Sequence, residues 1–248
     1  MKKNCSKYSY KVLFLGLFFS VAILFSSVQS EANSQNTIVG INTAGETYGS
    51  ALYCSESLDL ISAKATNGNI GYIRNEDLEE DSPSSPSEAL KLVNKDRIIP
   101  VYKNDGYTVI GYFVVESGNI STPLLTRGQA TSSVRQFSVD GSSYSNQSTV
   151  YVHNTSSPYV ESRAKVSASR TVDAGWLGTS PQLYDEEGHL IATSSFRYNS
   201  SACVSYETII TYNTSTGTYY ACGKTKVWSS TGNKYHTTTT YATPNQNF

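Results

Sequence analysis

The feature that most constrains the fold is the alternation of side chains in the second half of the chain. One face of residues 160–168 carries Val160, Ser162, Ala164, Val166 and Ala168, and the other carries Glu161, Arg163, Lys165 and Ser167. A period of two is what a half-buried β-strand requires. Seven or eight strand signals follow one another over residues 135–248, at spacings of 8–15 residues and with no helical segment. This half is therefore predicted to be an antiparallel β-sandwich or a barrel-like domain.

Turn and strand patterns in the first half predict a second, smaller unit at residues 42–116. Asn67-Gly68 favours a two-residue type I′ turn, because both central residues of that turn need a positive φ. This turn and a later Asn-Asp-Gly loop separate strand-like segments at 58–65, 70–74, 97–103 and 107–115. The unit is therefore expected to consist largely of strands.

One short helix is expected within this unit. Ser85 is a good N-cap, Pro86 suits the first helical position, and Glu88 completes a capping box. Ala89, Leu90 and Val93 would then form one apolar face. The helix is predicted over residues 86–94, which makes the unit a small α+β module in a mainly β protein.

Six short pieces of the module occur in a defined order. They are GETYGS at 45–50, DLISA at 59–63, NGNIGYIRNEDL at 67–78, SPSEAL at 85–90, IPVY at 99–102 and DGYTVIGYF at 105–113. Over residues 42–115 this pattern resembles a module of uncharacterised exported proteins from Gram-positive bacteria. The resemblance implies fold and export but no activity. The C-terminal half is only weakly similar to Tyr/Ser-rich secreted β-domains.

The N-terminal 30 residues have the order of features found in a secretory signal peptide. Lysines precede an uncharged 14-residue apolar run at 12–25, and small residues follow it. Cleavage is expected after Ser30, with Ala32 as second choice. An uncleaved anchor is the alternative, but the run would reach about 21 Å, short of the ~30 Å hydrocarbon core. The mature chain is therefore expected to be secreted, either free or held at the cell surface, with no stable transmembrane segment. Residues 31–41 would be its flexible N-terminus.

Composition changes around residues 117–134. This segment is rich in Ser, Thr and Gly without a period, so it is expected to link the module to a β-domain at 135–248. Residues 31–116 carry 13 acidic and 6 basic side chains, a net charge of −7, whereas the second half is near neutral. No basic stripe that could neutralise phosphates is present, so nucleic acid is not an expected partner.

Cys203 and Cys222 bracket a segment that is expected to form one β-hairpin. A turn at residues 213–217, which the local residues favour, puts the cysteines about 16 Å out of register, too far for a disulfide. A tight turn at residues 212–213 would place them opposite each other. Export favours the bond, so Cys203–Cys222 is the candidate disulfide, with Cys54 left as a free thiol.

The run Asp185-Glu186-Glu187-Gly188-His189 is the strongest candidate for a cation or acid cluster. It lacks the ligand spacing of a calcium loop. The favoured interpretation is a hairpin turn with acidic tips and Gly188 in the left-handed conformation. No metal site is predicted.

Other candidates for chemistry are weaker. Cys54 is the candidate thiol nucleophile, but no histidine lies in its half of the chain. A paired-carboxylate site could use Asp173, Glu161 or Glu207, which spacing alone does not decide. The acidic run at 79–82 is interpreted as a solvated loop near a helix N-terminus. No catalytic residue and no cofactor is predicted, and enzymatic activity is the less favoured possibility.

Aromatic residues of the second half are the ligand-binding candidates. Trp176, Tyr184, Tyr219 and Trp228, together with Tyr220, would suit a platform on which sugars stack. The favoured alternative is that the tryptophans are partly buried core residues.

Three classes of function remain. The favoured class is a non-catalytic binding or surface-interaction module for a cell-wall glycan or a protein ligand. A secreted effector of bacteriocin-like or toxin-like type is the first alternative, since the Thr-rich run at 235–243 would suit a pore strand as well as an exposed sheet face. A wall-polymer hydrolase is the second. The sequence specifies neither the ligand nor the oligomeric state.

Overall fold

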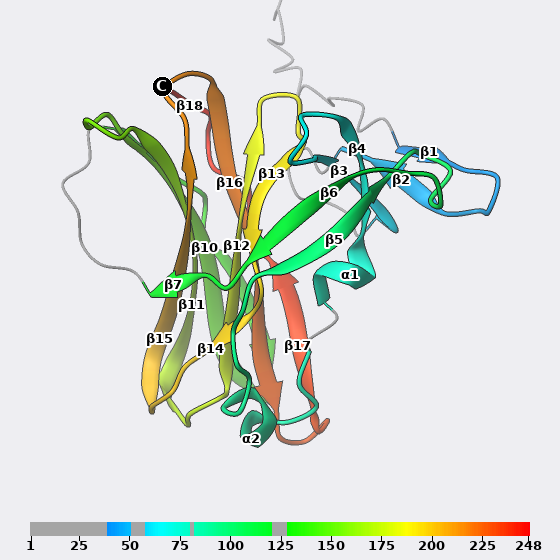
Figure 1. Ribbon diagram of the computed structural model, residues 1–248. Helices are drawn as coiled ribbons and strands as arrows, with labels where there is room; N and C mark the ends of the chain where they lie inside the picture. The colour runs from blue at the N-terminus through cyan, green and yellow to red at the C-terminus, as the bar shows by residue number, and fades with distance from the viewer. Residues whose placement is uncertain (1–38, 51–57, 80–81, 121–127) are drawn as a thin grey trace, which may run out of the picture. The chain divides into compact units, whose positions relative to one another are not determined.

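The computed structural model describes residues 39–50, 58–79, 82–120 and 128–248, which belong to one compact unit (Figure 1). The expected signal peptide, its cleavage site after Ser30 and Cys54 lie outside the described residues. Residues 39–41, within the segment expected to be a flexible N-terminus, form a strand. In the part of the chain that is described, no helix has the length and apolar character needed to cross a membrane.

Five strands close into a small barrel. They are β3 (Leu60–Lys64), β4 (Ile70–Arg74), β5 (Arg97–Tyr102), β6 (Val109–Glu116) and β13 (Leu190–Ser194). Neighbours pair in that order, and the barrel closes where Leu190 of β13 pairs with Ala63 of β3. Apolar side chains such as Ile61, Val101 and Phe113 form its core. One strand from the second half of the chain therefore completes the first-half module.

The hairpin between β3 and β4 forms as expected, but its turn is not type I′. Lys64 pairs with Ile70, which leaves a five-residue loop. Gly68 has a positive φ of 86°, whereas Asn67 does not. Asn67 acts instead through its side chain, whose Oδ1 accepts a hydrogen bond from the Asn69 backbone N–H at 3.0 Å. Beyond β3, the sheet is extended by β2 (Thr47–Gly49) and β1 (Val39–Ile41).

Two sheets form the sandwich predicted for the second half. The first runs from β13 through β12 (Leu177–Asp185), β16 (Thr218–Ser229) and β17 (Lys234–Thr239), with β14 (Arg197–Tyr198) and β18 (Gln246–Asn247) attached. The second contains β7 (Asn119–Ile120), β8 (Gly128–Thr131), β9 (Arg135–Val139), β10 (Ser142–His153), β11 (Tyr159–Val172) and β15 (Cys203–Asn213). Val160 of β11 packs inward against the first sheet, as the alternation predicts. The mainly β fold, with a small α+β module followed by a sandwich, is confirmed.

Strands β12 and β16 are buried on both faces. Leu183 packs in the core between the two sheets, whereas the next residue, Tyr184, packs in the barrel core. On β16, Ala221 packs in the core between the two sheets and Tyr220 packs in the barrel core. The barrel therefore covers the side of the first sheet that the second sheet leaves open. A strand covered on both sides need not alternate with polar residues.

The two helices are short, and α2 (Pro86–Ala89) has the expected cap. The Ser85 Oγ accepts a hydrogen bond from the Glu88 backbone N–H at 3.3 Å. The Glu88 carboxylate accepts from the backbone N–H of Ser84 at 2.9 Å, so the second half of the capping box is displaced by one residue.

The helix predicted to reach residue 94 ends at Ala89. Leu90 and Val93, which were expected to lie on its apolar face, are 48% and 85% exposed. Short helices depend on packing for their stability, and these side chains supply none. The other helix, α1 (Asn75–Glu79), follows β4 directly and was not predicted.

The predicted Cys203–Cys222 disulfide is wrong. Cys203 carries a free thiol. It pairs with Val172 of β11 in the second sheet, whereas Cys222 pairs with Gln182 of β12 in the first sheet. The chain does reverse before Gly217, which has a φ of 117°. However, β15 and β16 join different sheets, so neither of the two hairpin registers considered for the cysteines is formed.

The segment expected to be a linker contains β7 and β8. Both strands join the second sheet, where β7 pairs with β15 and β8 pairs with β10. Strand β13 belongs to the barrel and also continues into the sandwich. The domain boundaries at residues 117–134 stay a prediction.

Candidate functional site

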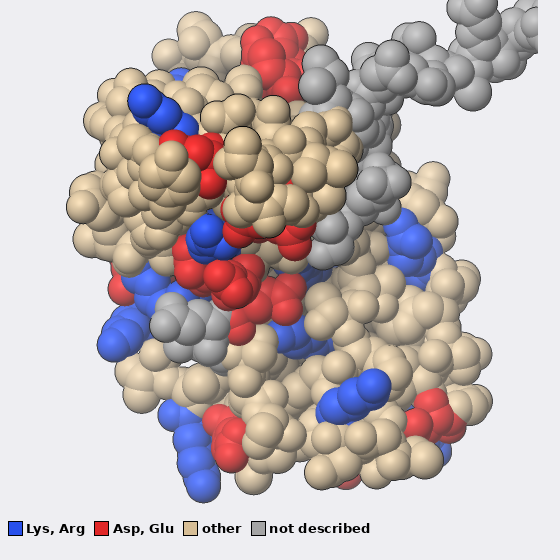
Figure 2. Space-filling view, turned by 90° about the vertical axis from the view of Figure 1, so that its right-hand side faces the viewer, with Lys and Arg blue, Asp and Glu red and all other residues tan. Residues whose placement is uncertain are grey.

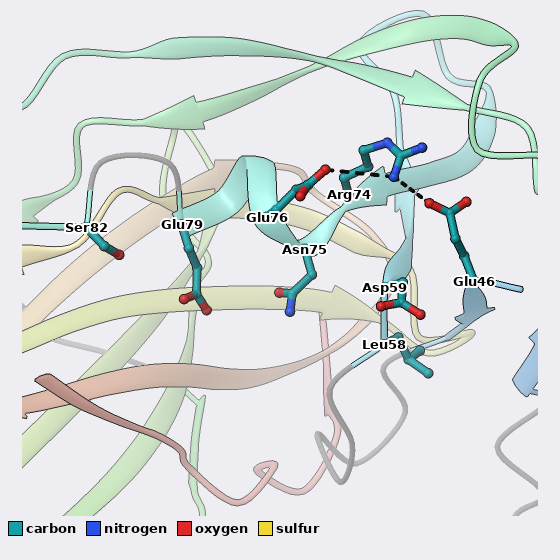
Figure 3. A pocket seen from close by; sticks show the side chains of 8 residues that line it. All are labelled: Glu46, Leu58, Asp59, Arg74, Asn75, Glu76, Glu79 and Ser82. Atoms are coloured by element: carbon teal, nitrogen blue, oxygen red, sulfur yellow. Dashed lines mark hydrogen bonds and ion pairs between the residues drawn. The ribbon is translucent and has the colours of Figure 1, made fainter. Parts of the chain in front are cut away.

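A polar pocket of about 550 Å³ opens beside α1. Its lining residues are Glu46, Leu58, Asp59, Arg74, Asn75, Glu76, Glu79 and Ser82 (Figure 3). Four carboxylates and one guanidinium give this lining a net formal charge of −3. Figure 2 faces the side on which α1 lies, and it shows acidic and basic side chains gathered close together.

Arg74, at the end of β4, organises one wall of the pocket. Its Nη1 lies 2.5 Å from Glu46 Oε1 and 3.8 Å from Glu76 Oε1 (Figure 3). Its Nη2 donates to the Gly106 carbonyl at 2.8 Å. Asn42 Nδ2 donates to the other Glu46 oxygen at 2.8 Å. The hydrogen bonds from Asn42 and then from Arg74 hold the pKa of Glu46 below its usual range.

Asp59 and Glu76, two further carboxylates of the pocket, differ in the number of hydrogen bonds and ion pairs that they form. Asp59 accepts hydrogen bonds from the Thr47 backbone N–H at 2.8 Å and from its hydroxyl at 2.7 Å. These bonds lower the pKa of Asp59. The Glu76 side chain is 77% exposed. Its one ion pair with a described residue is the contact with Arg74 at 3.8 Å. Glu76 is therefore the carboxylate that a ligand can reach most easily.

Strand β16 of the sandwich supplies two lysines behind α1. Lys224 Nζ donates to Asn75 Oδ1 at 2.6 Å and to Glu79 Oε1 at 2.7 Å. Burial is the largest single effect on Glu79 and raises its pKa. The charge and hydrogen bond of Lys224, together with the charge of Lys226, outweigh burial, so the pKa of Glu79 is lowered. Two residues further on, Lys226 Nζ donates to Ser82 Oγ.

These contacts correct the interpretation of the run 79–82 as a solvated loop for Glu79 and Ser82, the two of its residues that the structure describes. Glu79 and Ser82 line the pocket and bind lysines that are about 145 positions away in the chain. No local sequence pattern pointed to these lysine partners. The excess of acidic residues at 31–116 and the acidic run at 79–82 pointed only to an acidic region.

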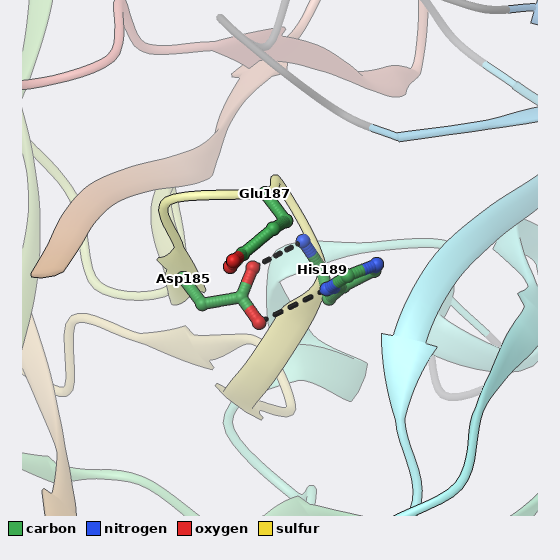
Figure 4. A group of neighbouring side chains, drawn as sticks. All are labelled: Asp185, Glu187 and His189. Atoms are coloured by element: carbon green, nitrogen blue, oxygen red, sulfur yellow. Dashed lines mark hydrogen bonds and ion pairs between the residues drawn. The ribbon is translucent and has the colours of Figure 1, made fainter. Parts of the chain in front are cut away.

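The run at residues 185–189 forms a turn between β12 and β13, as predicted. Gly188 has a φ of 82°, and its N–H donates to the Asp185 carbonyl at 3.0 Å. The His189 backbone N–H donates to Asp185 Oδ1 at 2.8 Å, and its ring Nδ1 lies 3.0 Å from Oδ2 (Figure 4). The hydrogen bond that the protonated His189 ring donates to the Asp185 carboxylate raises the pKa of His189.

Asp185, Glu187 and His189 are the residues that could hold a cation in this turn. Each offers one ligand atom, and these atoms lie within 4.8 Å of one another. However, Asp185 and His189 already bind each other, and Glu187 is exposed. The contacts are those of a hydrogen-bonded turn, which is sufficient to account for the cluster.

Of the three acids considered for a paired-carboxylate site, two come together. Glu161 on β11 and Glu207 on β15 both form ion pairs with Arg163, while Asp173 lies in the turn after β11. Glu161 is fully buried. Burial raises its pKa, against the effect of Arg163. The cluster is an ion-pair network within the sheet and does not open into a described pocket.

The aromatic candidates belong to the core. Tyr184, Tyr219 and Trp228 are buried, and Trp176 packs against the core between the sheets. Tyr220 is buried as well and stacks on Tyr184. A platform needs exposed ring faces, so the aromatic platform is wrong and the core alternative is confirmed for these residues.

Comparisons give no independent guide to the site. No protein-family model, no curated protein and no solved structure matches the chain.

Proposed function

We propose that this protein is an exported binding module whose acidic pocket takes amino groups of a cell-wall polymer. The observation that carries the proposal is the pocket beside α1, with its net formal charge of −3. Hydrogen bonds within the protein keep Glu46 and Asp59 ionised. Such a lining attracts cations and repels phosphates.

Export is supported by the N-terminal sequence pattern and by the resemblance over residues 42–115. A wall polymer with peptide branches carries free amino groups, which are protonated at neutral pH. The carboxylate of Glu76, which is exposed at this pocket, can pair with such a group.

The test is co-sedimentation of the purified protein with insoluble peptidoglycan, before and after its amino groups are acetylated. Acetylation removes the positive charge and leaves the glycan intact. Saturable binding that acetylation weakens is expected, with constant turbidity of the suspension. Equal binding to both preparations, or no binding, contradicts the proposal. Falling turbidity would instead support the wall-polymer hydrolase.

A further inference from the structure

A serine and a lysine meet at the edge of the pocket beside α1. Lys226 lies on β16 and donates from Nζ to Ser82 Oγ, although the two residues are 144 positions apart. Ser82 is exposed and lines the pocket, whereas Lys226 is only 3% exposed. An accessible hydroxyl is therefore held against a buried amine.

Burial makes the neutral form of Lys226 easier to reach than that of an exposed lysine. Its Nζ lies 4.2 Å from the centroid of the Phe196 ring, a cation–π contact that by itself favours the charged form. Burial lowers the pKa of Lys226 to about 8, although Glu79 on α1 opposes this effect and Lys224 on β16 adds to it. Tyr198 and Tyr235 belong to the same cluster as Phe196, and burial raises the pKa of both, so they stay neutral. A lysine in such surroundings can act as a base near neutral pH.

We infer that Ser82 and Lys226 form a nucleophile–base pair that accepts acyl groups from esters or amides in the pocket. A serine hydroxyl is a weak nucleophile until an adjacent base takes its proton, and a lysine is one of the groups that does so. The inference goes beyond binding. It rests on the proposed function in one respect, because binding of the wall polymer would bring the natural acyl donor to Ser82.

The chemical step balances with the two side chains and water. Neutral Lys226 Nζ takes the proton of Ser82 Oγ as this oxygen bonds to the carbonyl carbon. The tetrahedral intermediate collapses, its bond to the alcohol or amine breaks, and the leaving group takes the proton from the Lys226 ammonium. Water then attacks the acyl-serine with Lys226 as base, which releases a carboxylic acid and restores Ser82.

The experiment treats the purified protein with a fluorophosphonate, which reacts with activated serines, and follows one adduct by intact mass and peptide mapping. Modification of Ser82 is expected, with a rate that rises between pH 6 and 10 about a midpoint near 8. Ser82→Ala should abolish the adduct. Lys226→Met should slow its formation by about 100-fold or more, the usual range for loss of a general base. Ser84→Ala is the matched control and should react like the wild type, because Ser84 binds Glu88 and lies outside the pocket lining.

If the contact between Ser82 and Lys226 has only a structural role, the labelling experiment gives a different result. Absence of an adduct at Ser82, or a rate in Lys226→Met equal to that of the wild type, overturns the inference. Should that variant fail to fold, the pH profile of the wild type decides, since a flat profile also overturns it. Labelling does not require wall binding, so failure of the proposed function and failure of the nucleophile–base pair are distinguishable.

Discussion

Tyr184 and Tyr220 stack with their ring centroids 5.1 Å apart and their planes 9° from parallel. They lie opposite each other on β12 and β16, and both pack in the barrel core. The Tyr184 hydroxyl donates to Gln182 Oε1 at 3.1 Å, so its polar end is satisfied. The stacked pair therefore joins the barrel to the sandwich, whose strand β16 carries the lysines that bind Glu79 and Ser82.

Replacement of Tyr184 by alanine should lower the free energy of unfolding by about 3–5 kcal/mol, because it leaves a cavity between barrel and sandwich. Urea titration measures this change. Tyr107→Ala is the control, since Tyr107 is 75% exposed, and its effect should stay within about 0.5 kcal/mol. Similar values for the two variants would contradict the packing described for Tyr184.

The two histidines His153 and His189 should titrate on opposite sides of the usual histidine pKa of 6.5. Burial, and then the charge of Arg163, lowers the pKa of His153. The hydrogen bond to Asp185 raises the pKa of His189. NMR titration of the imidazole carbons, assigned with His153→Gln and His189→Gln, measures both. A shared midpoint would contradict these environments.

The raised pKa of His189 also predicts a pH-dependent stability. Its contribution is fully present below pH 6.5 and is lost as the pH rises through the folded-state pKa. His189→Gln should therefore lower stability more at pH 6 than at pH 8, as measured by urea titration at the two pH values. An effect that is equal at both would show that the Asp185 contact does not favour the protonated ring.

Cys203 should react with a maleimide in the native, unreduced protein. It carries a free thiol and is partly exposed at the start of β15. Cys222 is fully buried, so it should stay unlabelled under the same conditions. Peptide mapping after labelling reports each cysteine separately. Recovery of a Cys203–Cys222 disulfide would contradict the assignment of β15 and β16 to different sheets.

Local patterns predicted the features that depend on neighbouring residues. The strand over 160–168, the turn at Gly188 and the cap at Ser85 are all present, although Glu161 and Arg163 on the predicted polar face of that strand are buried. Each arises from strand periodicity or from turn and cap chemistry, which act over a few residues.

Contacts between residues that are far apart in the sequence could not be predicted from such local patterns. The turn before Gly217 shows that the chain reverses, but it does not show that β15 and β16 join different sheets. The burial of Tyr184 depends on the barrel that covers it. The contact between Lys226 and Ser82 arises because β16 brings its lysines to Glu79 at the end of α1 and to Ser82. These relationships depend on the packing of whole layers, which no short stretch of sequence encodes.

The most direct test of the proposed binding site compares two single-carboxylate variants in co-sedimentation with peptidoglycan. Glu76→Gln removes an exposed charge at the pocket, and Glu186→Gln removes an exposed charge from the turn between β12 and β13. The two variants have the same net charge, so a general charge effect is common to both. Glu76→Gln should bind about two- to fivefold more weakly than Glu186→Gln, since an exposed ion pair contributes roughly 0.5–1 kcal/mol. Equal affinities would contradict the assignment of this pocket as the binding site.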